Sequence, residues 1–335
     1  MISLGIESTA HTFGIGILDE KKILSDVKDI YKPPLGSGIH PTEARDHHEK
    51  IKEEVLKKSL EEAKLSLNDI DIVSYSAGPG LPPCLRVGME FAKELTKKTS
   101  AKLMAVNHGV AHIEIARLLT ESTDPIMLFV SGGNTQIIGY AAGKYRIFGE
   151  TQDIAIGNAR DVFIRNIIGK YPGGPVMDQL ALIGKKNYEE TGKLLSLPYS
   201  VKGMDLSFSG IVTAALKLKE KGESVEDICF AFQETTFAML TEVVERALAH
   251  TEKKEVLLTG GVAAAPRLGE MLNIMCEERG AKSYVVPKPL SGDNGAMIGW
   301  TGLVAYENGQ KPIPIDKADF YQRWRTDEVE ITWIK

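Results

Sequence analysis

His108 and His112 are the residues of this sequence whose type and spacing are best suited to chemistry. They stand four positions apart, so on a helix they share one face and both imidazoles can reach a single ion. The apolar run 103–106 before them predicts a strand, and residues 113–119 after them predict a helix. Two ordinary histidines near the start of a helix also fit this pattern, and the pair alone leaves both interpretations open.

Two glycine-containing turns are candidate sites for an anion or a nucleotide. The turn 131–135 has two consecutive glycines, whose N–H groups can approach an anion, and Ser131 and Asn134 add hydrogen-bond donors. A plain hairpin turn explains the same residues. The turn 260–266 joins a predicted strand to a predicted helix, an arrangement that brings backbone against nucleotides. It matches neither the dinucleotide-binding glycine pattern nor the P-loop.

Other polar groups allow both a functional and an ordinary interpretation. His40, His47 and His48 lie at the front of the predicted helix 41–64, where contacts to metal or phosphate compete with surface or capping roles. The polar turn 7–12 joins two strand-like runs. Its carboxylate and hydroxyl groups suit phosphate and Mg²⁺, but they also suit any hairpin.

The elements that must position these residues occur twice along the chain. Each set has three strand-like runs, 2–6, 13–18 and 22–27 in the first, and 126–130, 136–140 and 145–148 in the second. Helical patterns follow each set, which predicts an internally duplicated fold. The alternation of strands and helices over 70–119 favours a largely parallel sheet.

Three local predictions concern the ends of elements. Residues 77–88 are rich in glycine and proline and predict a loop, followed by a helix over 89–98. Asp293 stands where the N-cap of a helix is expected. The segment 329–334 predicts a final edge strand.

The bulk composition predicts a soluble, cytoplasmic protein. The chain has 335 residues, enough for two lobes with separate cores, and its 43% hydrophobic and 25% charged residues are ordinary for a globular enzyme. The net charge of -5 gives no general basic character, although local basic patches or a partner could still bind RNA. Cys84, Cys229 and Cys276 are too few for a disulfide framework. No stretch has the features of a signal peptide or a membrane span.

Seven motifs, in order along the chain, resemble a single family. They occupy 39–44, 77–81, 84–88, 107–112, 130–136, 205–210 and 293–298. Together they are similar to the tRNA threonylcarbamoyltransferases, the catalytic subunit of the archaeal and eukaryotic KEOPS complex and its bacterial counterpart TsaD. The resemblance extends from Ile6 to Trp333 and is greatest to archaeal members.

This resemblance implies an α/β protein with the duplicated actin/Hsp70/sugar-kinase (ASKHA) fold, in which two lobes contain mixed sheets flanked by helices. We expect an N-terminal lobe over 1–120 and a C-terminal lobe over 121–335. As an alternative for the last part, the helix from about residue 293 packs back on the first lobe.

The resemblance also implies an activity and a set of site residues. The expected reaction transfers a threonylcarbamoyl group from threonylcarbamoyl-AMP to the adenosine at position 37 of tRNA. His108, His112 and Asp293 would hold one Fe or Zn ion. Ten further residues would bind an ATP- or AMP-type nucleotide, with or without Mg. Ser131, Gly132, Gly133 and Asn134 would lie at the phosphates, and Asp161 and Asp178 at the ribose with Gly174 beside them. Gly260, Gly261 and Ala265 would lie near adenine.

The implied partners are tRNA and the other KEOPS subunits: a small kinase/ATPase subunit, a dimerising subunit and an accessory subunit. No membrane is implied. Some archaeal relatives carry the kinase fused at the C-terminus, so this chain could be one domain of a longer product. The resemblance does not decide whether the metal is Fe or Zn, what the stoichiometry of the complex is, or which surface contacts tRNA.

Three positions depart from the family pattern. Phe129 replaces a tyrosine that many archaeal members use as a further metal ligand, Ala265 replaces an asparagine, and Pro82 replaces a glycine. These changes bear on metal identity and nucleotide affinity more than on the fold.

Three other functions compete with the transferase. A zinc metalloprotease would need Glu directly after the first histidine as general base, where this chain has Gly109. A small-molecule kinase of the same superfold would leave His108, His112 and Asp293 without a role. A non-catalytic nucleotide-binding scaffold would fit Phe129 and Ala265, but it would not explain why both histidines and Asp293 are present.

Overall fold

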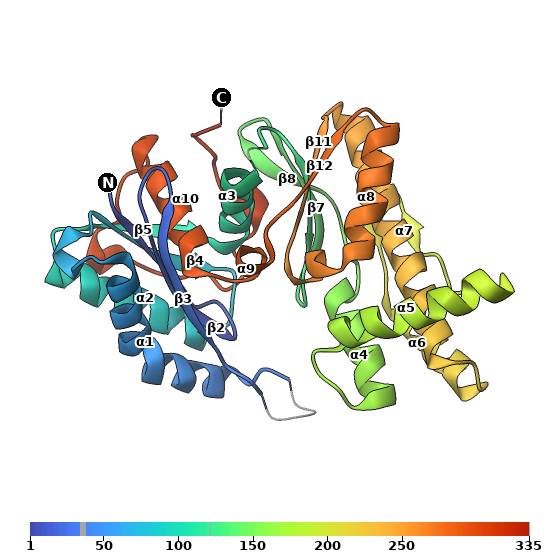
Figure 1. Ribbon diagram of the computed structural model, residues 1–335. Coiled ribbons are helices and arrows are strands. Elements are labelled where there is room, and N and C mark those ends of the chain that lie inside the picture. Colours follow the sequence, from blue (N-terminus) through green and yellow to red (C-terminus); the bar gives the residue numbers. More distant parts are fainter. Residues whose placement is uncertain (34–37, 121, 335) are drawn as a thin grey trace. The chain divides into compact units, whose positions relative to one another are not determined.

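The chain folds into two compact units in the computed structural model, which describes residues 1–33, 38–120 and 122–334 (Figure 1). The first unit comprises Met1–Leu119, Ala141–Tyr145 and Asp293–Lys335, and the second comprises Thr120–Tyr140 and Arg146–Gly292. The chain therefore returns to the first unit twice, once at the tip of a hairpin and once in its last part.

The first unit contains a five-stranded mixed sheet with the order β3-β2-β1-β4-β5. Its strands are β1 (Ser3–Glu7), β2 (Thr12–Leu18), β3 (Ile23–Ile30), β4 (Ile72–Gly78) and β5 (Lys102–Asn107). The first three strands pair antiparallel because short turns join them, whereas β4 and β5 pair parallel because helices connect them. The parallel arrangement expected over 70–119 is thus part of a mixed sheet.

In the described part of the first unit, the α-helices are α1 (Pro41–Ala63), α2 (Pro82–Lys98), α3 (His108–Thr120) and α10 (Gly295–Glu307). Short 3-10 turns lie at Leu67–Asp69, Ile315–Lys317 and Thr326–Glu328. The contact of α10 with β1 and β2 depends on glycine, because a Cβ on Gly16 would lie 2.1 Å from the backbone nitrogen of Ala296. This close approach fixes the start of α10, and with it Asp293, against the sheet.

The second unit repeats this design with the strand order β12-β11-β6-β7-β8. Its strands are β6 (Ile126–Val130), β7 (Thr135–Ala141), β8 (Lys144–Glu150), β11 (Glu255–Thr259) and β12 (Lys282–Val285). Strand β6 pairs antiparallel with β7 and parallel with β11, so this sheet is mixed as well. A small hairpin is formed by β9 (Val201–Lys202) and β10 (Asp205–Leu206).

The helices of the second unit are α4 (Ile156–Ile168), α5 (Gly173–Thr191), α6 (Ser209–Glu220), α7 (Val225–Thr251), α8 (Pro266–Glu278) and the short α9 (Lys288–Ser291), with a 3-10 turn at Gly261–Ala264. Helix α7 supplies much of the core, where Phe232 stacks on Phe163 of α4 at 5.7 Å between ring centroids. The α/β fold with mixed sheets flanked by helices, predicted from the sequence, is confirmed.

The predicted element ends need three corrections. Helix α2 begins at Pro82 rather than at residue 89, because prolines at its first positions are compatible with a helix start. The N-cap of α10 is Asn294, whose side chain accepts from the Met297 N–H at 2.9 Å, and not Asp293. Within the described residues the segment 329–334 is no strand and makes only an isolated bridge, between Glu330 and Lys144.

Among the described residues, no helix is both long and apolar enough to cross a lipid bilayer.

Candidate functional site

The junction of β5 and α3 positions the two histidines. Asn107 ends β5, and its side-chain oxygen accepts from the Val110 N–H at 3.1 Å, which satisfies an otherwise free donor in the first turn of α3. The Asn107 amide also donates to the Trp324 carbonyl at 3.1 Å. With the helix start fixed in this way, the rings of His108 and His112 lie on one face with centroids 4.7 Å apart.

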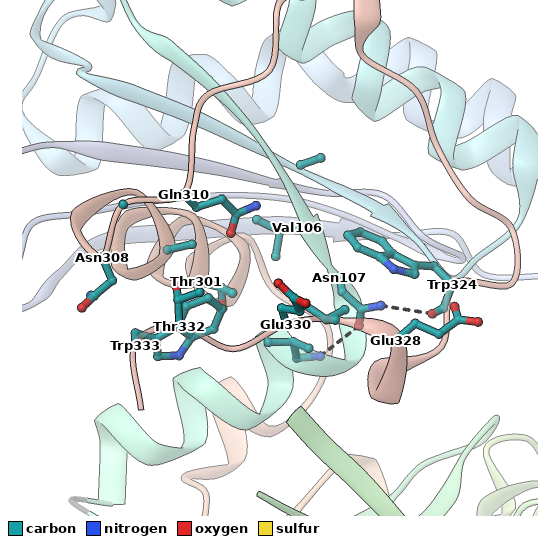
Figure 2. Close-up of a pocket in the computed structure, with 15 residues that line it drawn as sticks. Val106, Asn107, Thr301, Asn308, Gln310, Trp324, Glu328, Glu330, Thr332 and Trp333 are labelled. Atoms are coloured by element: carbon teal, nitrogen blue, oxygen red, sulfur yellow. Dashed lines mark hydrogen bonds between the residues drawn. The ribbon is translucent and has the colours of Figure 1, made fainter. Parts of the chain in front are cut away.

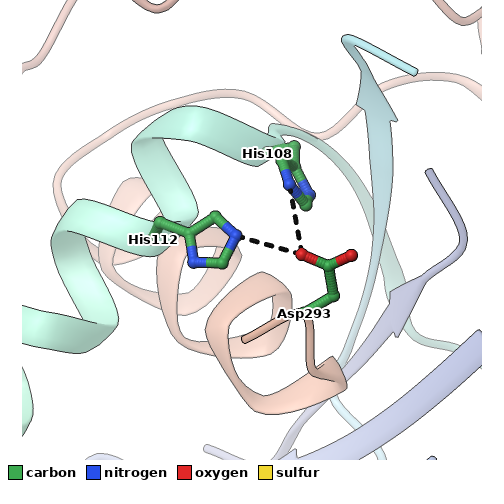
Figure 3. Close-up of side chains that lie close together, drawn as sticks. All are labelled: His108, His112 and Asp293. Atoms are coloured by element: carbon green, nitrogen blue, oxygen red, sulfur yellow. Dashed lines mark hydrogen bonds and ion pairs between the residues drawn. The ribbon is translucent and has the colours of Figure 1, made fainter. Parts of the chain in front are cut away.

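Asp293 completes the cluster from the turn before α10 (Figure 3). Its Oδ1 lies 3.3 Å from His112 Nε2 and 3.6 Å from His108 Nε2. Lys28 of β3 donates to the Asp293 backbone carbonyl at 3.1 Å and helps to hold this turn. The structure therefore brings together the three residues proposed as metal ligands, although they are distant in the sequence.

The distances from Asp293 to the two histidines fit a metal ion, and the three ligand atoms all lie within 4.8 Å of one another. Bonds of about 2.0–2.2 Å at tetrahedral angles would separate the ligand atoms by roughly 3.3–3.6 Å, which agrees with both measured distances. Two imidazoles and one carboxylate are ligands that suit Zn or Fe, and a fourth position would remain for a substrate or water.

Glu7, at the end of β1, contacts the cluster from behind. It is fully buried, and its carboxylate lies 3.0 Å from His108 Nδ1. It also accepts from the Thr9 N–H at 2.7 Å and from the Thr9 hydroxyl at 2.5 Å. Because a carboxylate only accepts, the proton of His108 must be on Nδ1, which leaves Nε2 directed toward Asp293. The sequence placed Glu7 in a polar turn but did not indicate this contact.

The charges in the cluster favour a positive group at its centre. Burial lowers the pKa of His108, but the negative charges of Glu7 and Asp293 outweigh burial and raise the pKa to about 9. Burial lowers the pKa of His112. Although burial raises the pKa of Asp293, the hydrogen bond from His112 and the charge of His108 bring it well below its usual range. The negative charges of Glu7 and Asp293, which here stabilise the protonated form of His108, would equally stabilise a bound metal cation.

In the second unit, the two glycine-containing turns lie side by side. A Cβ on Gly260, whose φ is +95°, would lie 2.3 Å from the carbonyl oxygen of Val130, the residue before the first turn. The first turn also contacts the start of α4, where the Gly157 N–H donates to the Ser131 carbonyl at 3.2 Å. Gly132, Gly133 and Gly261 have open space where a Cβ would be. The hydroxyl of Ser131 accepts from the Gly133 and Asn134 N–H groups, so these two donors already have a partner within the turn.

Asp161 and Asp178 are held beside the start of α5. Asp161 accepts from the Gly173 N–H at 2.6 Å, and Asp178 pairs with Arg160 and accepts from Gln233 at 2.8 Å. Arg160 also donates to the Gly174 carbonyl at 2.8 Å. Burial raises the pKa of both carboxyl groups. Arg160 and Gln233 were not identified from the sequence, since a buried arginine looks like any other charged helix residue.

Of the other candidate histidines, His47 and His48 make hydrogen bonds, whereas His40 is exposed. His47 bonds Asp29 at 2.9 Å, and its Nδ1 lies 3.3 Å from His48 Nδ1. His48 donates from Nε2 to the Ala10 carbonyl at 3.1 Å. His40 precedes α1 as its N-cap residue without a side-chain capping bond.

Two of the three departures from the family pattern lie at buried positions, and Pro82 is half-buried. Phe129 is a buried residue of β6, and Ala265 is buried at the N-cap of α8. Pro82 occupies the first turn of α2, where its ring is compatible with a helix. None of the three distorts the element that contains it.

Fold and cluster together define an actin-like α/β protein with a histidine–carboxylate site in its first unit. Comparison with solved structures agrees on the fold: Thermococcus kodakarensis HypF aligns over 92% of this chain and 49% of its own, with a TM-score of 0.64 at 14% identity. The activator of 2-hydroxyisocaproyl-CoA dehydratase from Clostridium difficile, with bound ADPNP, aligns over 94% of this chain and all of its own, with a TM-score of 0.54 at 13% identity.

Sequence comparison identifies the family. Residues 22–300 match TsaD, described as tRNA N6-adenosine threonylcarbamoyltransferase. The enzyme of that name from Thermococcus kodakarensis is 50% identical over 99% of this chain and all of its own length. A probable bifunctional tRNA threonylcarbamoyladenosine biosynthesis protein of Methanocaldococcus jannaschii is 48% identical over the whole of this chain, which spans 61% of that protein. The chain belongs to the tRNA N6-adenosine threonylcarbamoyltransferase family, as its motifs predict.

Proposed function

We propose that this chain transfers a threonylcarbamoyl group from threonylcarbamoyl-AMP to the exocyclic amine of the adenosine at position 37 of tRNA. The observation that carries the proposal is the His108, His112 and Asp293 cluster, in a chain of this family. In the reaction the amine nitrogen bonds to the carbamoyl carbon, the bond from that carbon to the phosphate oxygen breaks, AMP leaves and the amine loses a proton.

His108, His112 and Asp293 would hold one Fe or Zn ion, which as a Lewis acid would polarise the donor's carbonyl or phosphate oxygen. Glu7 keeps the His108 proton on Nδ1, so that Nε2 is available as a ligand. Lys28 and Asn294 hold the turn that carries Asp293, through the bond to its carbonyl and the N-cap of α10. These contacts would fix the ligands before the substrate arrives, which lowers the cost of ordering them.

Residues of the second unit would bind an AMP-type nucleotide. Ser131, Gly132, Gly133 and Asn134 form a turn whose glycines have open space beside them, which supports close approach of phosphate. Asp161 and Asp178 are hydrogen-bond acceptors suited to ribose hydroxyls, with Gly174 adjacent to them. Gly260, Gly261 and Ala265 would contact adenine. A Mg ion could accompany the phosphates.

The proposed setting is a cytoplasmic KEOPS-type complex with a small kinase/ATPase subunit, a dimerising subunit and an accessory subunit. The bifunctional name of the Methanocaldococcus jannaschii relative supports the idea that a second activity accompanies this one. The net charge of -5 also supports basic partner surfaces as a contribution to tRNA binding.

The test is an in vitro transfer reaction with the metal-loaded chain, the partner subunits, threonylcarbamoyl-AMP and two unmodified tRNAs that differ only in adenosine or guanosine at position 37. Mass spectrometry of the digested nucleosides should find threonylcarbamoyladenosine only with the adenosine-containing tRNA. Binding of tRNA and nucleotide without any product would instead favour the scaffold alternative, for which Phe129 and Ala265 are the sequence argument.

A further inference from the structure

The first unit contains a cavity of about 350 Å³ that includes none of the three proposed metal ligands (Figure 2). Its walls come from the end of β5, the first turn of α3, the last turn of α10 and the segment 324–333. The volume is at the small end of the range for ligand pockets, so it suits a small molecule or a single long side chain.

The polar groups of this cavity are acidic or neutral. Glu328 and Glu330 line it, and none of its fifteen lining residues is a lysine, arginine or histidine. Glu328 is fixed, since its carboxylate accepts from the Arg325 N–H at 3.0 Å. Glu330 is exposed and has no ion-pair partner among the described residues, although its backbone bridges that of Lys144. The cavity therefore disfavours anions, phosphate included, and favours a cation.

Two of the chain's three tryptophans, Trp324 and Trp333, also line the cavity. Indole is the aromatic ring that attracts cations most strongly. Asn107 joins this wall to the helix start, because its amide donates to the Trp324 carbonyl while its oxygen caps α3 (Figure 2). Gln310 and Asn308 add side-chain carbonyl oxygens that can accept further hydrogen bonds.

We propose that this cavity is a second binding site, specific for a guanidinium group. A guanidinium is planar, so it can stack on indole, and it presents its N–H donors in a fork that matches carboxylates. A lysine ammonium also carries positive charge but is compact and strongly hydrated, so it gains less from contact with an indole face. The group can come from an arginine side chain of a partner protein or from a free guanidine compound, and the chemistry of recognition is the same.

The test titrates the full-length chain with N-acetylarginine amide, a mimic of arginine in a protein, while the indole N–H resonances are followed by NMR. The resonances of Trp324 and Trp333, assigned from Trp324→Phe and Trp333→Phe, should shift and saturate. N-acetylcitrulline amide, which is neutral but of similar shape, should cause no saturable shift. Glu330→Gln should weaken binding at least about fivefold, as expected when one charged hydrogen bond is lost.

Glu53→Gln on the exposed face of α1 is the matched control, because it removes the same charge from the same unit away from the cavity, and its affinity should equal that of the wild type. Agmatine, a free guanidine compound, separates the two sources: tighter binding of N-acetylarginine amide supports a protein arginine, and tighter binding of agmatine supports a free compound. The proposal is overturned if no shift saturates, if N-acetylcitrulline amide or N-acetyllysine amide binds as tightly as N-acetylarginine amide, or if Glu330→Gln binds like the wild type.

Discussion

Replacing Glu7 with glutamine should weaken metal binding without removing a ligand. Glutamine has nearly the same shape, and its oxygen can still accept from the Thr9 N–H and hydroxyl, which lie at 2.7 and 2.5 Å from the present carboxylate. Its NH₂ group would then face His108 Nδ1, which now lies 3.0 Å from a carboxylate oxygen. An amide N–H cannot accept a proton, so Nδ1 must become the acceptor and the imidazole proton must move to Nε2.

The predicted loss follows from this change of tautomer. Nε2 is the atom directed at Asp293, and it must lose any proton before it can bind a metal. The wild-type His108, whose pKa is about 9, can release the Nε2 proton to zinc while Nδ1 keeps its proton on Glu7. In the variant the last imidazole proton would sit on Nε2 itself, so zinc would have to force it from its preferred nitrogen. Loss of a carboxylate partner behind a metal-binding histidine typically lowers metal affinity about 10- to 100-fold. That range corresponds to about 1.4–2.8 kcal/mol. Complete burial of Glu7 places the effect toward the upper end, because water cannot replace the missing acceptor.

The assay is a zinc titration of each purified protein in competition with a chromophoric chelator at pH 7.5, with thermal unfolding of the metal-free proteins as a check on folding. Glu114→Gln is the matched control. Glu114, on α3, is also a buried carboxylate, but it pairs with Tyr145 and Arg117 instead of an imidazole. Its zinc affinity should stay within about threefold of the wild type. The reasoning is refuted if Glu7→Gln binds zinc like the wild type, or if Glu114→Gln loses as much.

Three further predictions concern the fold and the second unit. Gly16→Ala should lower the free energy of unfolding by about 1–3 kcal/mol in urea titrations, since its Cβ would lie 2.1 Å from Ala296 N; an unchanged midpoint would contradict the close contact. The pKa of buried His48 is about 4, below its ordinary 6.5, so the unfolded chain takes up the proton first. The contribution of neutral His48 to the free energy of unfolding should be fully present above about pH 6.5 and should fall by about 3 kcal/mol as the pH drops through 4. Urea titrations across this pH range should not show that loss in His48→Gln. Asp161→Asn should weaken AMP binding about tenfold in calorimetry, because the amide would keep the Gly173 bond but lose one acceptor; equal affinity would remove Asp161 from the proposed ribose site.

The sequence predicts elements best where local pattern and packing agree. Strand β6 lies where it was predicted, at Ile126–Val130, because its five residues are all apolar and all buried. Helix α1, Pro41–Ala63, also agrees with the predicted range 41–64 to within one residue. The start of α2 was less predictable, since proline is found both in loops and in the first turn of a helix. Asn294 and Asp293 are adjacent and both can cap, and only the structure shows which of them does.

The proposed site is less visible in the sequence than the fold. The spacing of His108 and His112 suggests a shared ion, but Asp293 was associated with them by family resemblance alone. Glu7 is 101 residues from His108, and no local pattern predicts that contact. Arg160 escaped notice because charged residues are usually exposed, whereas this one is buried and paired with Asp178. The cavity beside Asn107 combines segments separated by about two hundred residues, so no local sequence pattern predicts it.

The most direct measurement compares threonylcarbamoyl transfer to unmodified tRNA by the wild type and by the His108→Ala/His112→Ala double variant, both assayed with partner subunits and added metal. If the cluster is the metal centre of the reaction, the double variant should lose activity by more than about 100-fold, since several kcal/mol of charge stabilisation are removed. Its AMP affinity should match that of the wild type, because the proposed nucleotide residues belong to the second unit. Transfer at the wild-type rate by the double variant would contradict a role for the cluster in catalysis.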